Sequence, residues 1–180
     1  MWPVSPFGPI TDVMVEHADG HRVLIAPSDE VAEFLAATYR FDEIRVEATT
    51  LGIRDQRWSV ASTSLQLSLE LGRRTTLGQL LATVPRSVAR SRWWCSAIDP
   101  FAHLLVRGVH TRGTAGGGRR EWYAALDLHA VDSVHAEWEG TDLGAVRPVE
   151  PPVRFGFGST PRSPSLTRIT TTVLIPSPAG

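Results

Sequence analysis

Hydrophobic and polar residues alternate along much of the chain, which is the period of a half-buried β-strand. Residues 12–17 and 22–25 flank Asp19-Gly20, a dipeptide that favours a tight hairpin turn. Residues 41–48 and 57–71 alternate as well, and the second segment predicts one long strand. One face of that segment carries leucines and the other carries polar side chains: Leu65, Leu67, Leu69 and Leu71, against Ser62, Ser64, Gln66, Ser68 and Glu70.

Helical spacing replaces this alternation in two places. Residues 28–39 begin with Ser28, which is a good N-cap residue, and carry an apolar stripe three and four residues apart. Residues 75–84 have leucines at the same spacing. Pro85 ends that helix and can begin a second short one over residues 86–92.

The second half of the chain returns to extended patterns. Residues 101–112 and 119–128 predict two long strands, joined by the glycine-rich segment 113–118, which we interpret as a mobile hairpin tip. Residues 129–139 continue as extended chain or turn near Asp132-Ser133. A threonine-rich last strand is expected over residues 167–175.

These elements predict an α+β protein with two or three short helices. The strands follow one another in hairpin order, which favours a mainly antiparallel sheet, and their length favours a strongly curved sheet or a partial β-barrel. We expect a single domain over residues 1–180, with an irregular segment at residues 1–10 and a loop-rich segment at 147–164 that holds five prolines.

Composition excludes several kinds of chemistry. The chain contains no lysine and no asparagine, and all 18 of its basic residues are arginine. Schiff-base enzymes, the P-loop lysine and the kinase strand lysine are therefore excluded. A GC-rich coding sequence would deplete both residues, so their absence indicates no function by itself. Cys95 is the only cysteine, which excludes an intrachain disulfide and a multi-cysteine zinc site.

Charge is balanced overall at −1 but unevenly distributed. Residues 1–60 carry ten acidic and five basic side chains, residues 61–120 two and nine, and residues 121–180 seven and four. The basic middle third could meet an anionic partner or the acidic ends of the same chain, within one subunit or in a homodimer. Without a signal peptide or a membrane-spanning stretch, we expect a cytoplasmic protein that binds no membrane; nucleic acid is not an expected partner.

The strongest candidate chemistry lies on the strand predicted from Phe101. His103 and Arg107 share a face that is otherwise apolar, and a buried arginine requires a partner. Arg107 could hold a carboxylate or phosphate with help from His103, or it could form a structural ion pair with Asp99 or Glu70. The candidate ligand-binding residues are Arg107, His103, Tyr123, Trp122 and His110.

Two other patterns contain residue types used in catalysis or metal binding. Asp127, His129, His135 and Glu137 form D-x-H and H-x-E pairs, but an extended strand holds the two histidines roughly 20 Å apart, so a solvated polar face is favoured. Cys95 beside two tryptophans is more typical of a small buried residue than of a nucleophile. We therefore expect no metal and no cofactor.

Together the sequence favours a small-molecule-binding domain with a pocket for an anionic ligand on the concave face of the sheet. Trp122 and Tyr123 would line the walls, and segment 113–118 would cover the site. One alternative is a lysine-independent enzyme, a hydrolase or isomerase with a histidine general base. The other is a protein-interaction module or homodimer that docks through the basic middle region.

Overall fold

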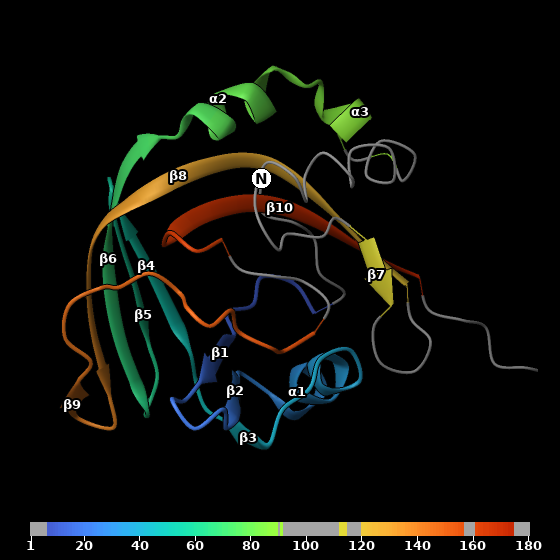
Figure 1. Cartoon of the computed structure of the whole chain (residues 1–180). Helices are drawn as coiled ribbons and strands as arrows, with labels where there is room; N and C mark the ends of the chain where they lie inside the picture. The colour runs from blue at the N-terminus through green and yellow to red at the C-terminus, as the bar shows by residue number, and fades with distance from the viewer. Residues whose placement is uncertain (1–6, 90, 92–111, 115–119, 157–160, 175–180) are drawn as a thin grey trace, which may run out of the picture. The chain divides into compact units, whose positions relative to one another are not determined.

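A computed structural model of the chain describes residues 7–89, 91, 112–114, 120–156 and 161–174 (Figure 1). The chain divides into two compact units, each built from three separate segments. The first unit comprises Met1–Ala36, Arg40–Gly72 and Val131–Arg147; the second comprises Ala37–Tyr39, Arg73–Ala130 and Pro148–Gly180.

The first unit begins with a three-stranded sheet in the order β1-β2-β3. Strands β1 (Val13–Glu16) and β2 (Arg22–Ala26) form the predicted antiparallel hairpin. Helix α1 (Asp29–Ala36) then carries the chain to β3 (Glu43–Val46), which pairs with β2 in parallel. A parallel neighbour needs such a crossover, so the prediction of a mainly antiparallel protein has this β2–β3 exception.

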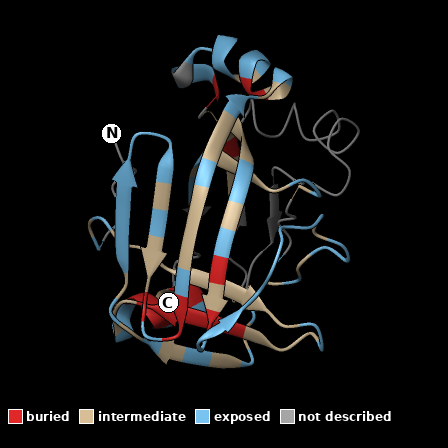
Figure 2. Ribbon diagram, turned by 90° about the vertical axis from the view of Figure 1, so that its left-hand side faces the viewer, coloured by how far each residue is buried: buried red, intermediate tan, exposed pale blue. Residues whose placement is uncertain are grey.

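Alternation along β2 gives this small sheet two buried faces. Val23 and Ile25 are fully buried and cluster with Leu65 and Trp138 from the larger sheet. Leu24 lies on the opposite face of the pleat, and α1 contributes Val31, Ala32 and Leu35 as buried residues. Figure 2 shows the buried residues concentrated in β2 and α1.

The larger sheet has seven strands, and its main path runs β10-β8-β6-β5-β4. The first unit contains β4 (Thr50–Arg54), β5 (Arg57–Ala61) and most of β6 (Leu65–Arg74). It also contains the last residues of β8 (Arg120–Trp138) and the short β9 (Thr141–Asp142). All the strand pairs of this sheet with a defined register are antiparallel.

The prediction of one strand over residues 57–71 is wrong, because the chain turns back at residues 62–64 and forms β5 and β6. Ser62 stabilises the turn: its amide donates to the Leu65 carbonyl at 2.8 Å, and its hydroxyl accepts from the Leu65 amide at 3.1 Å. A serine can occupy a polar position of an alternating strand, and its hydroxyl can also form the hydrogen bonds of a turn. The alternating pattern therefore did not reveal the turn at Ser62.

The second unit holds α2 (Thr76–Thr83), the short α3 (Arg86–Ala89), β7 (Arg112–Thr114), the first part of β8 and β10 (Ser165–Leu174). The Thr75 hydroxyl caps α2 by accepting from the Gly78 amide at 3.0 Å. Strand β8 runs without a break through Asp132 and Ser133, so the extended form of that prediction is confirmed.

The predicted class is confirmed: the protein is α+β, with short helices and mainly antiparallel sheets. Among the described strands, β4 and β10 end the path of the larger sheet without pairing to each other, so the sheet is open there. The described residues of segment 147–164 form no helix or strand. Residues 101–111 and 115–119, on which a predicted strand and the glycine-rich segment mostly fall, lie outside the described residues.

Candidate functional site

One face of β4, β5 and β6 is polar, and the strand register arranges its side chains in rows. Arg54 lies opposite Arg57, which lies opposite Glu70. The adjacent row contains Gly52, Ser59 and Ser68. Long charged side chains therefore stand beside a row of small residues, and this difference in length hollows the surface.

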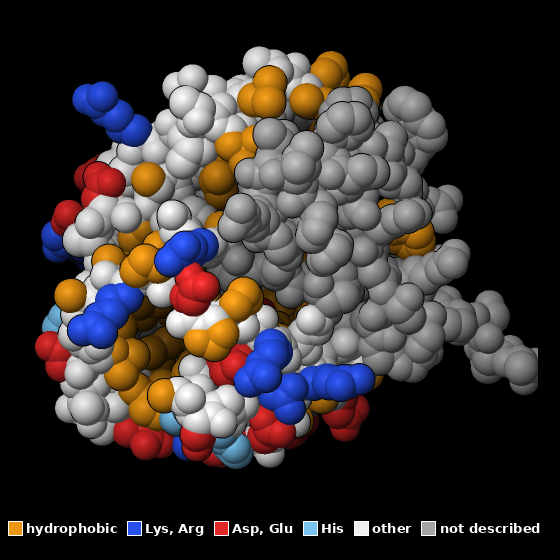
Figure 3. Space-filling model, in the orientation of Figure 1, with side chains coloured by type: hydrophobic (Ala, Val, Ile, Leu, Met, Phe, Trp, Pro, Cys, Tyr) orange, Lys and Arg blue, Asp and Glu red, His pale blue; other side chains and the backbone are white. Residues whose placement is uncertain are grey.

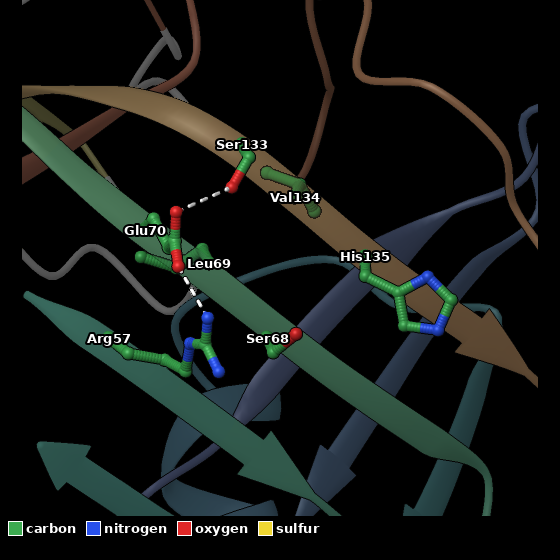
Figure 4. Close-up of a pocket in the computed structure, with 7 residues that line it drawn as sticks. All are labelled: Arg57, Ser68, Leu69, Glu70, Ser133, Val134 and His135. Atoms are coloured by element: carbon green, nitrogen blue, oxygen red, sulfur yellow. Dashed lines mark hydrogen bonds and ion pairs between the residues drawn. The ribbon is translucent and has the colours of Figure 1, made fainter.

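A cleft of about 280 Å³ lies over this hollow (Figure 4). Arg57, Glu70 and Ser133 line one side, Ser68 lies on the floor, and His135 of β8 stands at the other end. Leu69 and Val134 complete the lining. All of these residues belong to the first unit.

An ion pair forms one wall of the cleft. Arg57 Nη2 lies 2.5 Å from Glu70 Oε1, and the Ser133 hydroxyl lies 3.4 Å from the second carboxylate oxygen. The hydrogen bond from Arg57, followed by its charge, holds the pKa of Glu70 below its usual value. Because the two side chains are 67% and 48% exposed, water screens the pair and it adds little to stability.

Arg54 gives this row an excess of positive charge. It lies opposite another arginine, an arrangement that costs energy unless a counter-charge is near. Among the described residues the Arg54 side chain has no hydrogen bond or ion pair, and Glu70 balances only one of the two guanidinium groups. The row formed by Arg54, Arg57 and Glu70 therefore carries a net charge of about +1 at neutral pH.

Small and polar side chains lie beside the ion pair, on the same face as the cleft residue Ser68. A Cβ atom on Gly52 would lie 2.6 Å from the Ser59 hydroxyl oxygen, so glycine leaves that hydroxyl in place. Ser59 and Ser68 present their hydroxyls on the same face. His135 Nε2 lies 3.4 Å from Glu137 Oε1, and its side chain is 64% exposed. Guanidinium, hydroxyl and imidazole groups together can donate hydrogen bonds to a carboxylate or phosphate.

The opposite face of the same strands is apolar and only partly covered. Leu51, Val60 and Leu67 form one row, and Ile53, Trp58 and Leu69 form the next. The exposed fractions of Leu51 and Ile53 are 38% and 43%. Figure 3 shows hydrophobic side chains lining a hollow at the lower left, where β4, β5 and β6 lie in Figure 1.

A polar network in the first unit ties β3 to the turn before β6 and to the residue that follows β8. Arg45 contacts Glu43 at 2.6 Å, Glu139 at 2.5 Å and the Ser64 hydroxyl at 2.9 Å. Its guanidinium carbon lies 5.1 Å from the centre of the Trp138 ring. Because the Arg45 side chain is only 24% exposed and its partners fill its surroundings, we interpret the network as structural.

The candidate residues predicted from the sequence are only partly described. His103, Arg107 and His110 lie outside the described residues, as does Cys95. The Tyr123 hydroxyl lies 2.7 Å from the Tyr39 hydroxyl in the second unit. Trp122 is its neighbour on β8, and adjacent strand residues point to opposite faces, so the two rings face different sides of the sheet.

The D-x-H and H-x-E pairs form separate local contacts along β8. Asp127 Oδ2 lies 2.7 Å from Arg74 and 3.7 Å from His129 Nε2. Burial alone would raise the pKa of Asp127, but hydrogen bonds from Arg74 and from the Leu128 amide outweigh it and hold that pKa below its usual value. No group of three or more histidine, cysteine, aspartate or glutamate side chains suited to a metal occurs in the described part of the chain.

Sequence reasoning missed Arg54, Arg57, Ser59 and Ser68 as members of one site. The signal was present in the polar face of residues 57–71, but those residues converge only when the segment is folded as a hairpin and β4 is added. His135 was considered as a metal ligand and instead borders the cleft.

Comparison with known proteins adds no further information: no family model, no curated protein and no solved structure matches this chain. Among the described residues, no helix is long and apolar enough to span a membrane.

Proposed function

We propose that this protein is a small-molecule-binding domain that holds its ligand by a carboxylate or phosphate group. The observation that supports the proposal is the cleft over β5, β6 and β8, which is lined by Arg57, Glu70 and serine hydroxyls. Arg54 lies outside the lining, opposite Arg57 in the same row. The excess positive charge of the row provides attraction for an anion. The serine hydroxyls and His135 provide directional hydrogen bonds.

Arg57 would be the principal contact. Its Nη2 group is occupied by Glu70, but a guanidinium carries five N–H donors and can hold a second oxygen-bearing group beside the first. Arg54 would add charge from the edge of the row. The Glu70 carboxylate would repel an anion that comes close to it. The site therefore favours a compact anionic group, which can contact Arg57 without approaching Glu70, over a bulky one.

The sequence supports a second location for the same chemistry, on a concave sheet face beside His103, Arg107 and His110. Trp122 and Tyr123 would contribute from opposite faces of β8, so only one of the two rings could line that pocket. An anion site at this second location would depend on Arg107, and the Arg107→Ala variant tests it separately.

The test is a titration with inorganic phosphate, acetate and citrate, followed by thermal shift and calorimetry at constant ionic strength. Arg57→Met should weaken binding roughly 10- to 100-fold, as expected for loss of a charged hydrogen bond. Arg54→Met should weaken it less, because Arg54 acts at longer range.

Arg162→Met is the matched control, because Arg162 is equally exposed and is paired with Glu150 in the second unit. It removes the same charge and should leave binding unchanged. Saturable binding that survives Arg57→Met and disappears in Arg107→Ala would move the site to the second location. No saturable binding of any of the three anions would refute the proposal.

A further inference from the structure

Strand β4 is an edge of the larger sheet as far as the described strands extend. It lies at the end of the strand order and pairs only with β5 among the described strands. All five of its residues are exposed, including Leu51 and Ile53. An edge strand of this kind presents unpaired backbone groups that can bind another strand.

The hairpin geometry shows which backbone groups are available. Arg54 and Arg57 close a two-residue turn at Asp55-Gln56, in which Asp55 has the positive φ of 54° that primed hairpin turns use. The closing pair of such a hairpin exchanges both of its hydrogen bonds, and the pattern alternates from there. The amides and carbonyls of Thr50, Gly52 and Arg54 therefore point toward β5, and those of Leu51 and Ile53 point outward.

Natural edge strands usually carry features that prevent pairing, such as proline, a bulge or several charges. Strand β4 has the sequence Thr-Leu-Gly-Ile-Arg, with no proline and with a single charge at one end. Its register with β5 is continuous from Thr50 to Arg54, so no bulge twists the edge away. The edge is therefore suited to pairing.

We propose that β4 pairs with β4 of a second copy of this chain, antiparallel and centred on Gly52. The strand is self-complementary in this register. Leu51 lies opposite Ile53 of the partner subunit, and Thr50 lies opposite Arg54 of the partner subunit, so no like charges face each other. The outward groups of Leu51 and Ile53 then form four backbone hydrogen bonds across the twofold axis.

Side-chain burial favours the same register. Leu51 and Ile53 lie on the apolar face, where they extend the rows that contain Val60 and Trp58. Pairing continues these rows into the second copy and covers two exposed aliphatic side chains in each subunit. The two Gly52 residues, one from each copy, can approach each other closely because neither has a side chain. A random partner sequence would satisfy the backbone but would not complete both apolar rows.

Cysteine cross-linking tests the register directly, in a Cys95→Ser background that removes the only native thiol. In the proposed pair the two Gly52 Cα atoms are about 4.5 Å apart, within the range that a disulfide spans. Gly52→Cys should form a disulfide dimer under mild oxidation by glutathione disulfide. The new Cβ displaces only the Ser59 hydroxyl, which can rotate.

Thr50→Cys is the matched control on the same exposed strand. In the proposed pair, residue 50 of one copy faces residue 54 of the other. The two cysteines at position 50 would therefore lie four positions, or about 13 Å, apart along the strands and should not cross-link. Equal cross-linking at both positions would indicate parallel pairing or random collision, and either outcome would overturn the proposal.

Sedimentation provides a second readout that does not depend on a new thiol. The wild-type chain should show concentration-dependent dimerisation between about 1 µM and 1 mM, since a single strand pair is a small interface. Ile53→Lys should abolish it, and Leu143→Lys should not, because Leu143 is an exposed aliphatic residue of the same unit outside β4. A wild-type chain that stays monomeric over this range, together with no dimer from Gly52→Cys, would refute self-pairing.

Discussion

Replacing Gly78 by alanine should destabilise the protein, although the same change stabilises most helices. Gly78 lies in α2 and is buried. A Cβ atom there would lie 2.2 Å from the Leu128 carbonyl oxygen and 2.9 Å from the Leu128 amide nitrogen, both backbone atoms of β8. Because a backbone cannot rotate out of the way as a side chain can, the helix or the strand must move.

The size of the effect follows from the hydrogen bonds at that contact. Opening the gap from 2.2 Å to the 3.0 Å that Cβ contacts keep requires a shift of about 0.8 Å. Thr75 donates to the Leu128 carbonyl from its amide at 3.0 Å and from its hydroxyl at 3.2 Å. The same shift would stretch both bonds beyond useful length, at a cost of about 1 kcal/mol each.

Helix propensity opposes this loss by at most about 1 kcal/mol, the preference for alanine over glycine in a helix interior, because Gly78 lies in the first turn of α2. With the lost packing included, Gly78→Ala should lower the free energy of unfolding by about 1–3 kcal/mol. Urea unfolding at 25 °C, followed by tryptophan fluorescence and circular dichroism, would measure it. Ala82→Gly at an exposed position of α2 is the control and should cost about 1 kcal/mol. A Gly78→Ala protein as stable as the wild type, or more stable, would refute the contact.

Three further changes test the first unit. Arg45→Met should lower the free energy of unfolding by about 2 kcal/mol, because it removes charged hydrogen bonds, including the one to Glu139, and leaves only alkyl packing on Trp138; an unchanged urea midpoint would contradict this. Burial raises the pKa of Asp12 above 3.8, so the fold favours its protonated form and loses stability as the pH rises through the folded pKa. Asp12→Asn should therefore raise the Tm at pH 7, with the gain shrinking toward zero at pH 3; a gain independent of pH would point to another cause. Asp55→Gly should raise the free energy of unfolding by about 0.5–1 kcal/mol, because glycine adopts the positive φ at this turn without steric cost; a loss in the same urea assay would indicate a role for the carboxylate.

Much of the fold could be predicted because local signals agreed with the final structure. The Asp19-Gly20 turn, the Ser28 and Thr75 positions and the threonine-rich last strand all correspond to observed elements. The turn and the two helix starts depend on contacts within a few residues of the chain. The last strand is indicated by its β-branched threonines, although it forms by pairing with the distant β8. Strand β4 was missed because Thr50–Arg54 is short and exposed, and its only predictive feature is the turn at Asp55.

The candidate cleft could not be predicted for a different reason. Arg57, Glu70 and His135 come together through strand register, which depends on where the chain turns. Reading Ser62 as part of a strand placed Arg57 and Glu70 at opposite ends of one extended segment, roughly 40 Å apart. A single misread turn therefore separated the two residues that form the ion pair of the site.

The division of the first unit into three segments also has a consequence for synthesis on the ribosome. Val23, Ile25 and Leu65 are made early, but Trp138, which completes their cluster, arrives only after the intervening residues 73–130. At about 5–20 residues per second, translation of that stretch takes roughly 3–12 s. During this interval the nascent chain lacks Trp138, so the apolar surface that Trp138 covers in the folded unit stays exposed. We therefore expect chaperones that bind apolar segments to act before Trp138 leaves the exit tunnel.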